Sequence, residues 1–191
     1  MNPTQLSREL RTAQTPEMTR RRWIVGLSIV GTVAGQLVAL YQVGVIKHLP
    51  DPPIPIFDSS RVDASDYAYK RYNTPDGLLM IITYGVTAAL AGAGSKDRAR
   101  TNPTLPIAMG AKLLYDALLT IKLGSEEWQD NKALCAYCQA ATIATLVSVG
   151  LAVPEVIEAV RNLLGNTSNE DVQPFAERAR ERVDSLLGGA K

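Results

Sequence analysis

The chain contains very few residues of the types that build metal centres or disulfide frameworks. Its 191 residues include two cysteines, Cys135 and Cys138, and one histidine, His48. A structural zinc site uses four Cys or His ligands, and these residues supply at most three. Two cysteines are also too few for the frameworks that staple small secreted domains. The composition therefore predicts no metal site and excludes a disulfide-stapled miniprotein.

Charged residues are scarce in the middle of the chain. The sequence has 20 basic and 19 acidic residues, a net charge of +1, and a mean hydropathy of zero. Nineteen of these charges lie in residues 1–22 and 155–191, so the central 132 residues carry only 20. A chain without a strongly basic field is not expected to bind nucleic acid. The zero average thus conceals charged ends around an apolar centre.

Long apolar runs fill this centre. Three are uncharged throughout and have 24, 19 and 22 residues: 23–46, 77–95 and 133–154. A fourth, 101–121, is interrupted only by Lys112 and Asp116. A helix needs about 20 apolar residues to cross roughly 30 Å of hydrocarbon. The pattern predicts an all-α integral membrane protein, a four-helix bundle, and excludes a soluble enzyme.

Apolarity alone sets the expected ends of the first span, and capping or breaking residues help to set those of the others. The first apolar run is longer than the core of a cleaved signal, which has 7–15 residues, so a retained anchor is favoured. Pro at a first helical turn and Pro beyond a last turn mark the other boundaries. The expected spans are Trp23 to about Leu49, Thr74 to about Gly94, Thr101 to about Leu123, and Asp130 or Asn131 to about Pro154. The membrane domain is then 23–154.

The two ends of the chain flank this domain as a head, residues 1–22, and a tail, residues 155–191. Ser168 and Asp171 form a capping pattern, and apolar residues follow at helical spacing as far as Leu187. This pattern predicts an amphipathic C-terminal helix lying against the membrane or the bundle. A solvated, partly frayed tail is the alternative.

Basic residues predict the orientation, because Lys and Arg near span ends stay on the cytoplasmic side. The head has five arginines, and residues 96–100 contain three basic residues. The 47–76 loop has four basic residues over 30 positions, and the 122–132 loop has two. Both termini and the tail helix are therefore predicted cytoplasmic. The 47–76 loop and the start of the fourth span then face the periplasm or its equivalent.

The two cysteines are separated by two residues and lie near a predicted helix start. Such a pair can close a disulfide ring, and a helix N-terminus favours the thiolate form of a cysteine. Cys138 lies about 4.5 Å deeper than Cys135 at 1.5 Å per residue. Cys135 would therefore exchange disulfides with a partner at the water side, and Cys138 would meet a compound dissolved in lipid. The alternative is two inert core thiols, since Cys is commonly buried.

Lys112 and Asp116 stand four apart on one face of the third span. Ionisable residues within a membrane are costly and often serve as proton relays or pocket walls. Opposite charges at this spacing can also neutralise each other as a structural pair. The sequence leaves both interpretations open.

The arrangement of these features resembles the vitamin K epoxide reductase family. Its members are four-helix membrane oxidoreductases that couple a quinone to thiol-disulfide exchange. The resemblance rests on the four spans, on the Cys-x-x-Cys segment 134–139 at the start of the fourth, and on the long first loop. Residues 58–65 also look like the serine-bearing part of that loop. The resemblance covers about residues 20–155.

The resemblance implies a function and a set of site residues. Cys138 would react with a quinone of the ubiquinone, menaquinone or phylloquinone class, and Cys135 would exchange electrons with a thiol protein. Polar groups at the outer ends of the second and fourth spans would bind the quinone, here Asp76 in place of an Asn and Thr142 in place of a Tyr. Tyr137, between the cysteines, is a further cofactor-binding candidate.

One departure from the family is plain, because residues 47–76 contain no cysteine pair to relay electrons. Either a separate thioredoxin-like extracytoplasmic protein reaches Cys135 directly, or the protein has lost disulfide formation. A tail of 37 residues cannot hold a fused thioredoxin-like domain. The sequence thus predicts a quinone-linked thiol-disulfide oxidoreductase of a bacterial inner membrane or its equivalent. The alternative function is a non-catalytic four-span scaffold or subunit with core cysteines.

Overall fold

A computed structural model describes the backbone of residues 2–188 and the side chains of residues 2–165. Within these residues the chain forms seven α-helices, one 3-10 helix and no β-strand. The predicted all-α class is confirmed. In chain order the elements are α1 (Pro3–Thr12), α2 (Pro16–Gln42), α3 (Ser59–Asp63), η1 (Asp66–Tyr69), α4 (Asp76–Gly92), α5 (Arg98–Thr101), α6 (Thr104–Asn131) and α7 (Ala136–Gly188).

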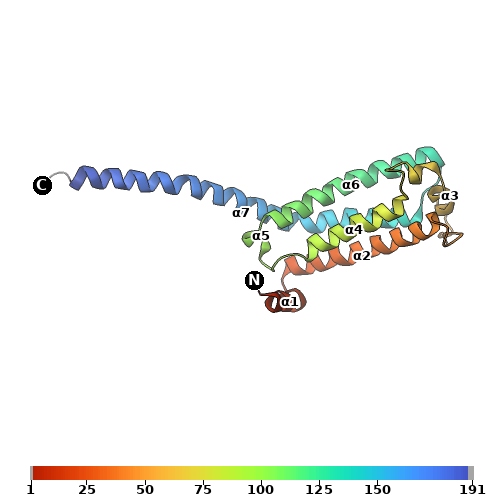
Figure 1. Ribbon diagram of the computed structural model, residues 1–191, viewed down its shortest axis with the longest axis horizontal. Coiled ribbons are helices and arrows are strands. Elements are labelled where there is room, and N and C mark those ends of the chain that lie inside the picture. The colour runs from red at the N-terminus through yellow and green to blue at the C-terminus, as the bar shows by residue number, and fades with distance from the viewer. Residues whose placement is uncertain (1, 189–191) are drawn as a thin grey trace.

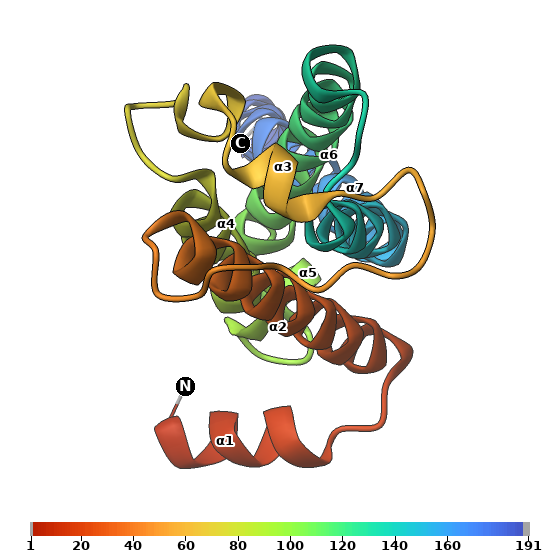
Figure 2. The same cartoon turned by 90° about the vertical axis from the view of Figure 1, so that its right-hand side faces the viewer.

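The four long helices α2, α4, α6 and α7 lie side by side, and α7 continues well beyond the other three (Figure 1). Helix α2 packs against both α4 and α7, and α6 packs against α7 and α4. The short helix α3 and the 43–75 segment cover one end of this assembly, whereas α1 and α5 lie at the other end (Figures 1 and 2).

Three of these helices are long and apolar enough to cross a membrane. They are α2, α6 and the first 30 residues of α7, Ala136–Gly165. Helix α4 is apolar but has 17 residues, about 26 Å at 1.5 Å per residue, which is short of a 30 Å hydrocarbon core. Three of the four predicted spans therefore have the required length, and a crossing by α4 stays a prediction.

The predicted first span is displaced by seven residues at each end. Helix α2 begins at Pro16, because the Thr15 hydroxyl accepts the Met18 N–H at 3.2 Å and caps the helix. It ends at Gln42, where Gly44 adopts a left-handed conformation with φ of 79°. The Trp23 to Leu49 boundaries were set by apolarity alone, and the capping residues override them.

The predicted 122–132 loop is wrong, because α6 continues to Asn131. Lys122 and Glu126 pair across one turn at 3.6 Å in this extension. The helix ends where Lys132 takes a left-handed backbone conformation with φ of 51°. The fourth helix consequently begins at Ala136 instead of Asp130 or Asn131.

The predicted helix end at Pro154 is also wrong, since α7 passes through it. Proline removes one backbone donor, but its fixed φ suits a helix. The next residue, Glu155, is buried and paired with Arg98 at 2.7 Å, so packing holds the chain in place beyond the proline. The backbone remains helical to Gly188. The capping pattern and apolar stripe predicted between Ser168 and Leu187 lie outside the described side chains.

Small residues allow α2 and α4 to approach closely. An added Cβ at Gly77 would meet the Ala39 backbone nitrogen at 2.5 Å, and one at Gly31 would meet the Tyr84 ring at 2.5 Å. Small residues one turn apart are typical of close contacts between membrane helices. This approach brings the first turn of α4 to the end of α2, where Gln42 Nε2 donates to Asp76 Oδ1 at 2.6 Å.

Candidate active site

The two cysteines lie at the N-terminus of α7, as the sequence predicts. Cys135 directly precedes the helix and Cys138 is in its first turn. The Cys138 backbone N–H donates to the Cys135 sulfur at 3.2 Å, so the thiol occupies the position of an N-cap side chain. Both thiols are free. With a helix start at Asp130 or Asn131, Cys135 would lie within the helix, but it precedes α7 because the helix begins at Ala136.

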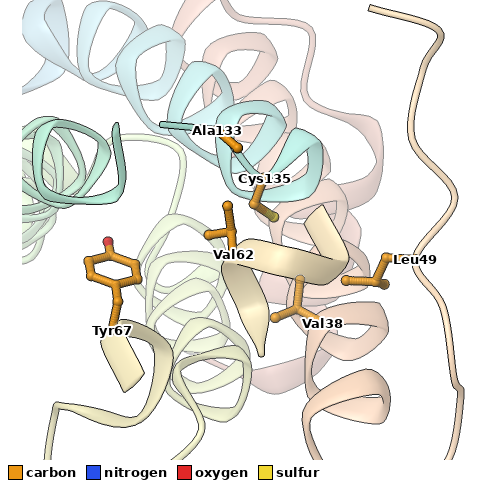
Figure 3. Packing of buried hydrophobic residues seen from close by; sticks show 6 residues of the cluster. All are labelled: Val38, Leu49, Val62, Tyr67, Ala133 and Cys135. Carbon is orange, nitrogen blue, oxygen red and sulfur yellow. The ribbon is translucent and has the colours of Figure 1, made fainter. Parts of the chain in front are cut away.

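Cys135 is completely buried, with 0% of its surface exposed. It packs among apolar side chains from α2, the first loop, α3 and the connection between α6 and α7, namely Val38, Leu49, Val62, Tyr67 and Ala133 (Figure 3). Cys135 was predicted to face water, but residues of the 49–67 segment cover it in the structure. Burial raises the pKa of the Cys135 thiol, which outweighs the helix N-terminus that was expected to lower it.

The first loop is joined to the cysteine segment by backbone hydrogen bonds. Phe57 and Leu134 form an isolated parallel bridge. The Leu134 N–H donates to the Ile56 carbonyl at 2.8 Å, and the Asp58 N–H donates to the Leu134 carbonyl at 3.1 Å. The loop therefore follows the residues just before Cys135 instead of standing apart from them.

Ser59 makes the side-chain link between this loop and α7. Its hydroxyl accepts the Ala136 N–H at 2.9 Å and donates to the carboxylate of Asp51. Its own N–H donates to Asp51 Oδ2 at 2.8 Å. Ser59 is buried and belongs to the serine-bearing segment on which the family resemblance was noted. One residue thus satisfies an N-terminal amide of α7 and holds the loop over Cys135.

Glu127 supports the cysteine segment from the opposite side. Its carboxylate accepts the Cys135 N–H through Oε1 and the Gln139 side-chain amide through Oε2 at 3.3 Å. It is buried on the part of α6 that was expected to be a loop. Sequence analysis missed Glu127 for that reason, although an acid eight residues before a Cys-x-x-Cys pair was visible.

Asp63 brings a buried carboxyl to the two sulfurs. It ends α3 and is 1% exposed. A carboxylate oxygen of Asp63 and the sulfurs of Cys135 and Cys138 all lie within 4.8 Å of one another. Burial raises the pKa of Asp63 to about 8, and the Cys135 thiol opposes that rise. These three donor atoms could approach a metal ion, but they fall one short of a structural zinc set.

A cavity of about 480 Å³ lies beside Cys138. It is enclosed by α4, α6 and α7 and by the end of the first loop, and its wall is mainly apolar. The volume is in the range of small-molecule pockets. The lining residues are Tyr67, Arg71, Tyr72, Asp76, Leu79, Met80, Thr83, Tyr84, Tyr115, Asp116, Leu119, Thr120, Leu123, Gly124, Glu127, Cys138, Gln139, Ala141, Thr142 and Thr145.

Two of the three predicted cofactor-binding residues line this cavity. Asp76 does so while accepting a hydrogen bond from Gln42. Thr142 does so while donating to the Cys138 carbonyl at 2.9 Å. Tyr137 is absent from the lining, because its hydroxyl donates to the Pro50 carbonyl at 2.7 Å. The structure thus places Asp76, Thr142 and Cys138 together and turns Tyr137 toward the first loop.

Arg71, near the end of the first loop, lines the cavity and was not singled out from the sequence. Its guanidinium is 5.2 Å from the centroid of the Tyr67 ring, and the Tyr67 hydroxyl donates to the Leu123 carbonyl at 2.8 Å. Arg71 Nη1 lies 3.9 Å from Asp76 Oδ2 and makes no hydrogen bond to a described residue. Arg71 Nη2 lies 3.7 Å from Glu126 Oε2, so the guanidinium lies between two carboxylates in the cavity wall.

Lys112 and Asp116 form an ion pair, and Asp116 lines the cavity. Their atoms Nζ and Oδ2 are 2.5 Å apart, and the Thr83 hydroxyl donates to Asp116 Oδ1 at 3.2 Å. Lys112 also donates to the Thr83 carbonyl at 2.5 Å. The two opposite charges neutralise each other, which agrees with the interpretation of Lys112 and Asp116 as a structural pair. Asp116 also contributes to the cavity wall, as the second interpretation allows.

Comparison with known proteins identifies the family. The model of the Vitamin K epoxide reductase family matches residues 22–153, more than two thirds of the chain. No curated protein and no solved structure matches the sequence. The matched segment includes most of α2, all of α4 and α6, the Cys135–Cys138 pair and the lining of the cavity. Together with its three long apolar helices, this match makes the protein a membrane oxidoreductase at the family level. The chain belongs to the vitamin K epoxide reductase family.

Proposed function

We propose that the protein is a quinone-linked thiol-disulfide oxidoreductase in which Cys135 and Cys138 cycle between dithiol and disulfide. One observation carries the proposal. Cys138 lies in the wall of a 480 Å³ apolar cavity, and the Cys135 sulfur lies directly behind it, within 4.8 Å. One sulfur can therefore reach a compound in the cavity while the other completes the disulfide.

The cavity suits a flat ring with two oxygen atoms and an apolar tail. Arg71 supplies a guanidinium group to its wall, and Thr83 supplies a hydroxyl oxygen that can accept a hydrogen bond while its proton is donated to Asp116. Tyr115 lines the cavity and is 65% exposed, so the cavity reaches the apolar outer surface of the helices. An isoprenoid tail would leave there into lipid. These features support a quinone of the ubiquinone, menaquinone or phylloquinone class.

The residues of the chain have distinct parts in this reaction. A bound quinone accepts two electrons and two protons as the two S–H bonds break and the S–S bond forms. Cys138 presents its sulfur to the ring, and Cys135 closes the disulfide from the buried side. Asp76 and Thr142 flank Cys138 in the cavity wall, where they orient the ring. The enclosing apolar residues exclude water from the reacting atoms.

The thiol partner we propose is a thioredoxin-like extracytoplasmic protein. Its access to Cys135 requires a movement of the first loop, because Cys135 is buried beneath that segment. The hydrogen bond of Ser59 to Ala136 and the two backbone hydrogen bonds of Leu134 to the loop hold the closed position. None of the three is a hydrogen bond within α7, so the loop can open without unfolding that helix.

The proposed setting is the inner membrane of a bacterium or an equivalent membrane. Helix α4 is the fourth crossing, so residues 23–154 form a four-span bundle between the head and the tail. Both termini lie on the cytoplasmic side, and the cysteine pair faces the periplasm. The arrangement of the ends supports this orientation, since α1 and the arginine-rich α5 lie opposite the end that carries α3 and Cys135 (Figure 1).

A non-catalytic membrane scaffold is the second candidate function. The complete burial of Cys135 favours it, since a core thiol is inert. The two functions differ in whether the thiols respond to quinone.

The test uses the full-length protein in detergent, reduced and freed of reductant. A short-chain quinone is added under anaerobic conditions, and the remaining thiols are counted by the mass added on alkylation. The wild type is expected to lose both thiols, whereas Cys135→Ser and Cys138→Ser are each expected to keep the remaining one. The chain has no other cysteine, so every thiol counted belongs to the pair. Unchanged thiols in the wild type would favour the scaffold.

A further inference from the structure

The carboxyl of Asp63 is buried, and its hydrogen bonding is incomplete. It is 1% exposed, and among the residues that the structure describes its Oδ2 atom has no hydrogen-bond partner. A buried polar group without a partner costs about 1 to 3 kcal/mol. An apolar residue at this position would avoid that cost, so the carboxyl calls for another explanation.

Local structure directs this carboxyl toward the sulfurs. The side chain of Asp58 accepts the Arg61 N–H at 3.1 Å and caps α3, which is a single turn. Within that turn Val62 and Asp63 point inward, whereas Arg61 is exposed. Ser59, at the start of the same turn, is bonded to the first residue of α7. The carboxyl and the cysteine pair are therefore held by one connected set of contacts.

Titratable groups that act on Asp63 lie on the first loop, α4, α6 and the start of α7. The Tyr69 hydroxyl of η1 is one of them, and the others are carboxyls and thiols. They are Asp51, Asp76, Glu127, Cys135 and Cys138. The thiols are the groups with which Asp63 can exchange a proton at short range, since its oxygen and both sulfurs lie within 4.8 Å of one another.

We propose that Asp63 is the acid-base residue of the cysteine pair, taking the proton of Cys135 when the disulfide forms and returning it when the disulfide is reduced. This inference rests on the proposed thiol-disulfide chemistry. Cys138 can release its proton into the cavity that it lines. Cys135 is fully buried and does not line the cavity, so its proton needs a carrier within the protein.

The step balances in both directions. On oxidation, two S–H bonds break and one S–S bond forms. Two electrons pass to the quinone, which takes one proton from Cys138 and one from water. Asp63 keeps the Cys135 proton. On reduction by a dithiol, the S–S bond breaks, Asp63 returns its proton to Cys135, Cys138 takes a proton from the dithiol, and the second dithiol proton goes to water.

Electrostatics supports this assignment. Burial raises the pKa of Asp63 to about 8, and burial also raises the pKa of the Cys135 thiol. Proton transfer is most efficient when the carrier titrates near the working pH and not far from the group it serves. An ordinary carboxyl, with a pKa near 4, would be a poor base for a thiol.

The first experiment compares the rate of quinone-dependent thiol loss in the wild type, Asp63→Asn and Asp63→Glu across pH. We expect the wild-type rate to rise with pH through about 8, as the carboxylate forms. Asp63→Asn is expected to be slower by about 100-fold near neutral pH and to approach the wild type at high pH, where Cys135 ionises unaided. Asp63→Glu is expected to recover part of the rate.

The matched control is Asp66→Asn, the same substitution three residues later at an exposed site. It is expected to keep the wild-type rate and pH profile. A wild-type profile in Asp63→Asn would overturn the inference while leaving the proposed function intact. If the wild type shows no thiol loss with quinone, the proposed function itself fails.

A second experiment does not depend on quinone. The pair is oxidised with a water-soluble dithiol oxidant, and the infrared difference spectrum between the two states is recorded near pH 9, where Asp63 of the reduced protein is mainly ionised. We expect a change in the absorption of a protonated carboxyl that is present in the wild type and in Asp66→Asn and absent in Asp63→Asn. The same spectrum in wild type and Asp63→Asn would overturn the inference.

Discussion

The Ala136 N–H donates a hydrogen bond of 2.9 Å to the hydroxyl of Ser59, which lies 77 residues earlier in the chain. This contact connects the first loop to the first turn of α7. It also sets the depth of Cys135, because the loop residues that follow Ser59 cover the sulfur. The chemistry of the cysteine pair is therefore coupled to the position of the loop.

Replacing Ser59 with Ala should expose Cys135. The substitution removes the hydroxyl that bonds Ala136 and Asp51. The loss of such a contact lowers the cost of opening the loop by about 1 to 2 kcal/mol, which corresponds to a roughly 5- to 30-fold faster reaction of Cys135. The measurement is the alkylation rate of Cys135 in a Cys138→Ser background. Ser65→Ala is the control, because the Ser65 hydroxyl bonds only within the loop, to Val62.

An alkylation rate in Ser59→Ala equal to that in Ser65→Ala would contradict the closing role of Ser59.

Filling the cavity should weaken quinone use without affecting the thiols. Leu119→Trp places a large ring in the cavity wall, so the KM for quinone is expected to rise by about tenfold or more. Oxidation by a water-soluble reagent is expected to stay at the wild-type rate. Leu118→Trp, one residue away, is 63% exposed and outside the lining, and it should keep the wild-type KM. Equal KM values in the two variants would show that quinone binds elsewhere.

The contact between α2 and α4 should be intolerant of a single methyl group. Gly77→Ala puts a Cβ 2.5 Å from the Ala39 backbone nitrogen, and the helices must separate at a cost of about 1 to 3 kcal/mol. Gly85→Ala, on the same helix, meets nothing within 4 Å and is expected to be neutral or stabilising by up to about 1 kcal/mol. The midpoints of thermal unfolding in detergent measure the difference. A similar loss in both variants would place the close approach elsewhere.

The pH dependence of stability should report the buried carboxyl of Asp63. Its pKa is raised from 3.8 to about 8, so the folded protein keeps a proton that the unfolded chain releases above pH 4. The contribution of Asp63 to stability therefore falls as pH rises from about 4 to 8. In Asp63→Asn this fall should be absent. The stability of the variant relative to the wild type should therefore be greater at pH 9 than at pH 5. Unfolding midpoints at both pH values test this, and parallel curves for the two proteins would count against it.

The sequence was sufficient for the features that depend on short segments. The apolar runs predict helices, and the position of Cys135 and Cys138 at the start of the last long helix is predicted as well. The helix ends were less predictable, because α6 continues past Leu123 through a surface ion pair and α7 passes Pro154 with the support of a buried one. Both pairs depend on side-chain packing that apolarity does not report.

The parts of the site that could not be predicted depend on long-range contacts. Asp63 and Ser59 stand next to each other in the segment 58–65, yet only the folding of the loop onto α7 shows that one faces the sulfurs and the other caps the helix. Glu127 was hidden by the expected 122–132 loop. Arg21 was counted only as a positive charge, although it is buried and its Nε donates to the Ala91 carbonyl at the end of α4 at 2.8 Å.

The stoichiometry of an anaerobic titration tests the redox role of the pair most directly. Reduced protein in detergent is titrated with a short-chain quinone, while the quinone absorbance and the number of alkylatable thiols are followed together. We predict that one quinone is reduced for every two thiols lost, and that Cys138→Ser reduces none. Quinone that stays oxidised while both Cys135 and Cys138 remain alkylatable would contradict a quinone-linked thiol-disulfide oxidoreductase.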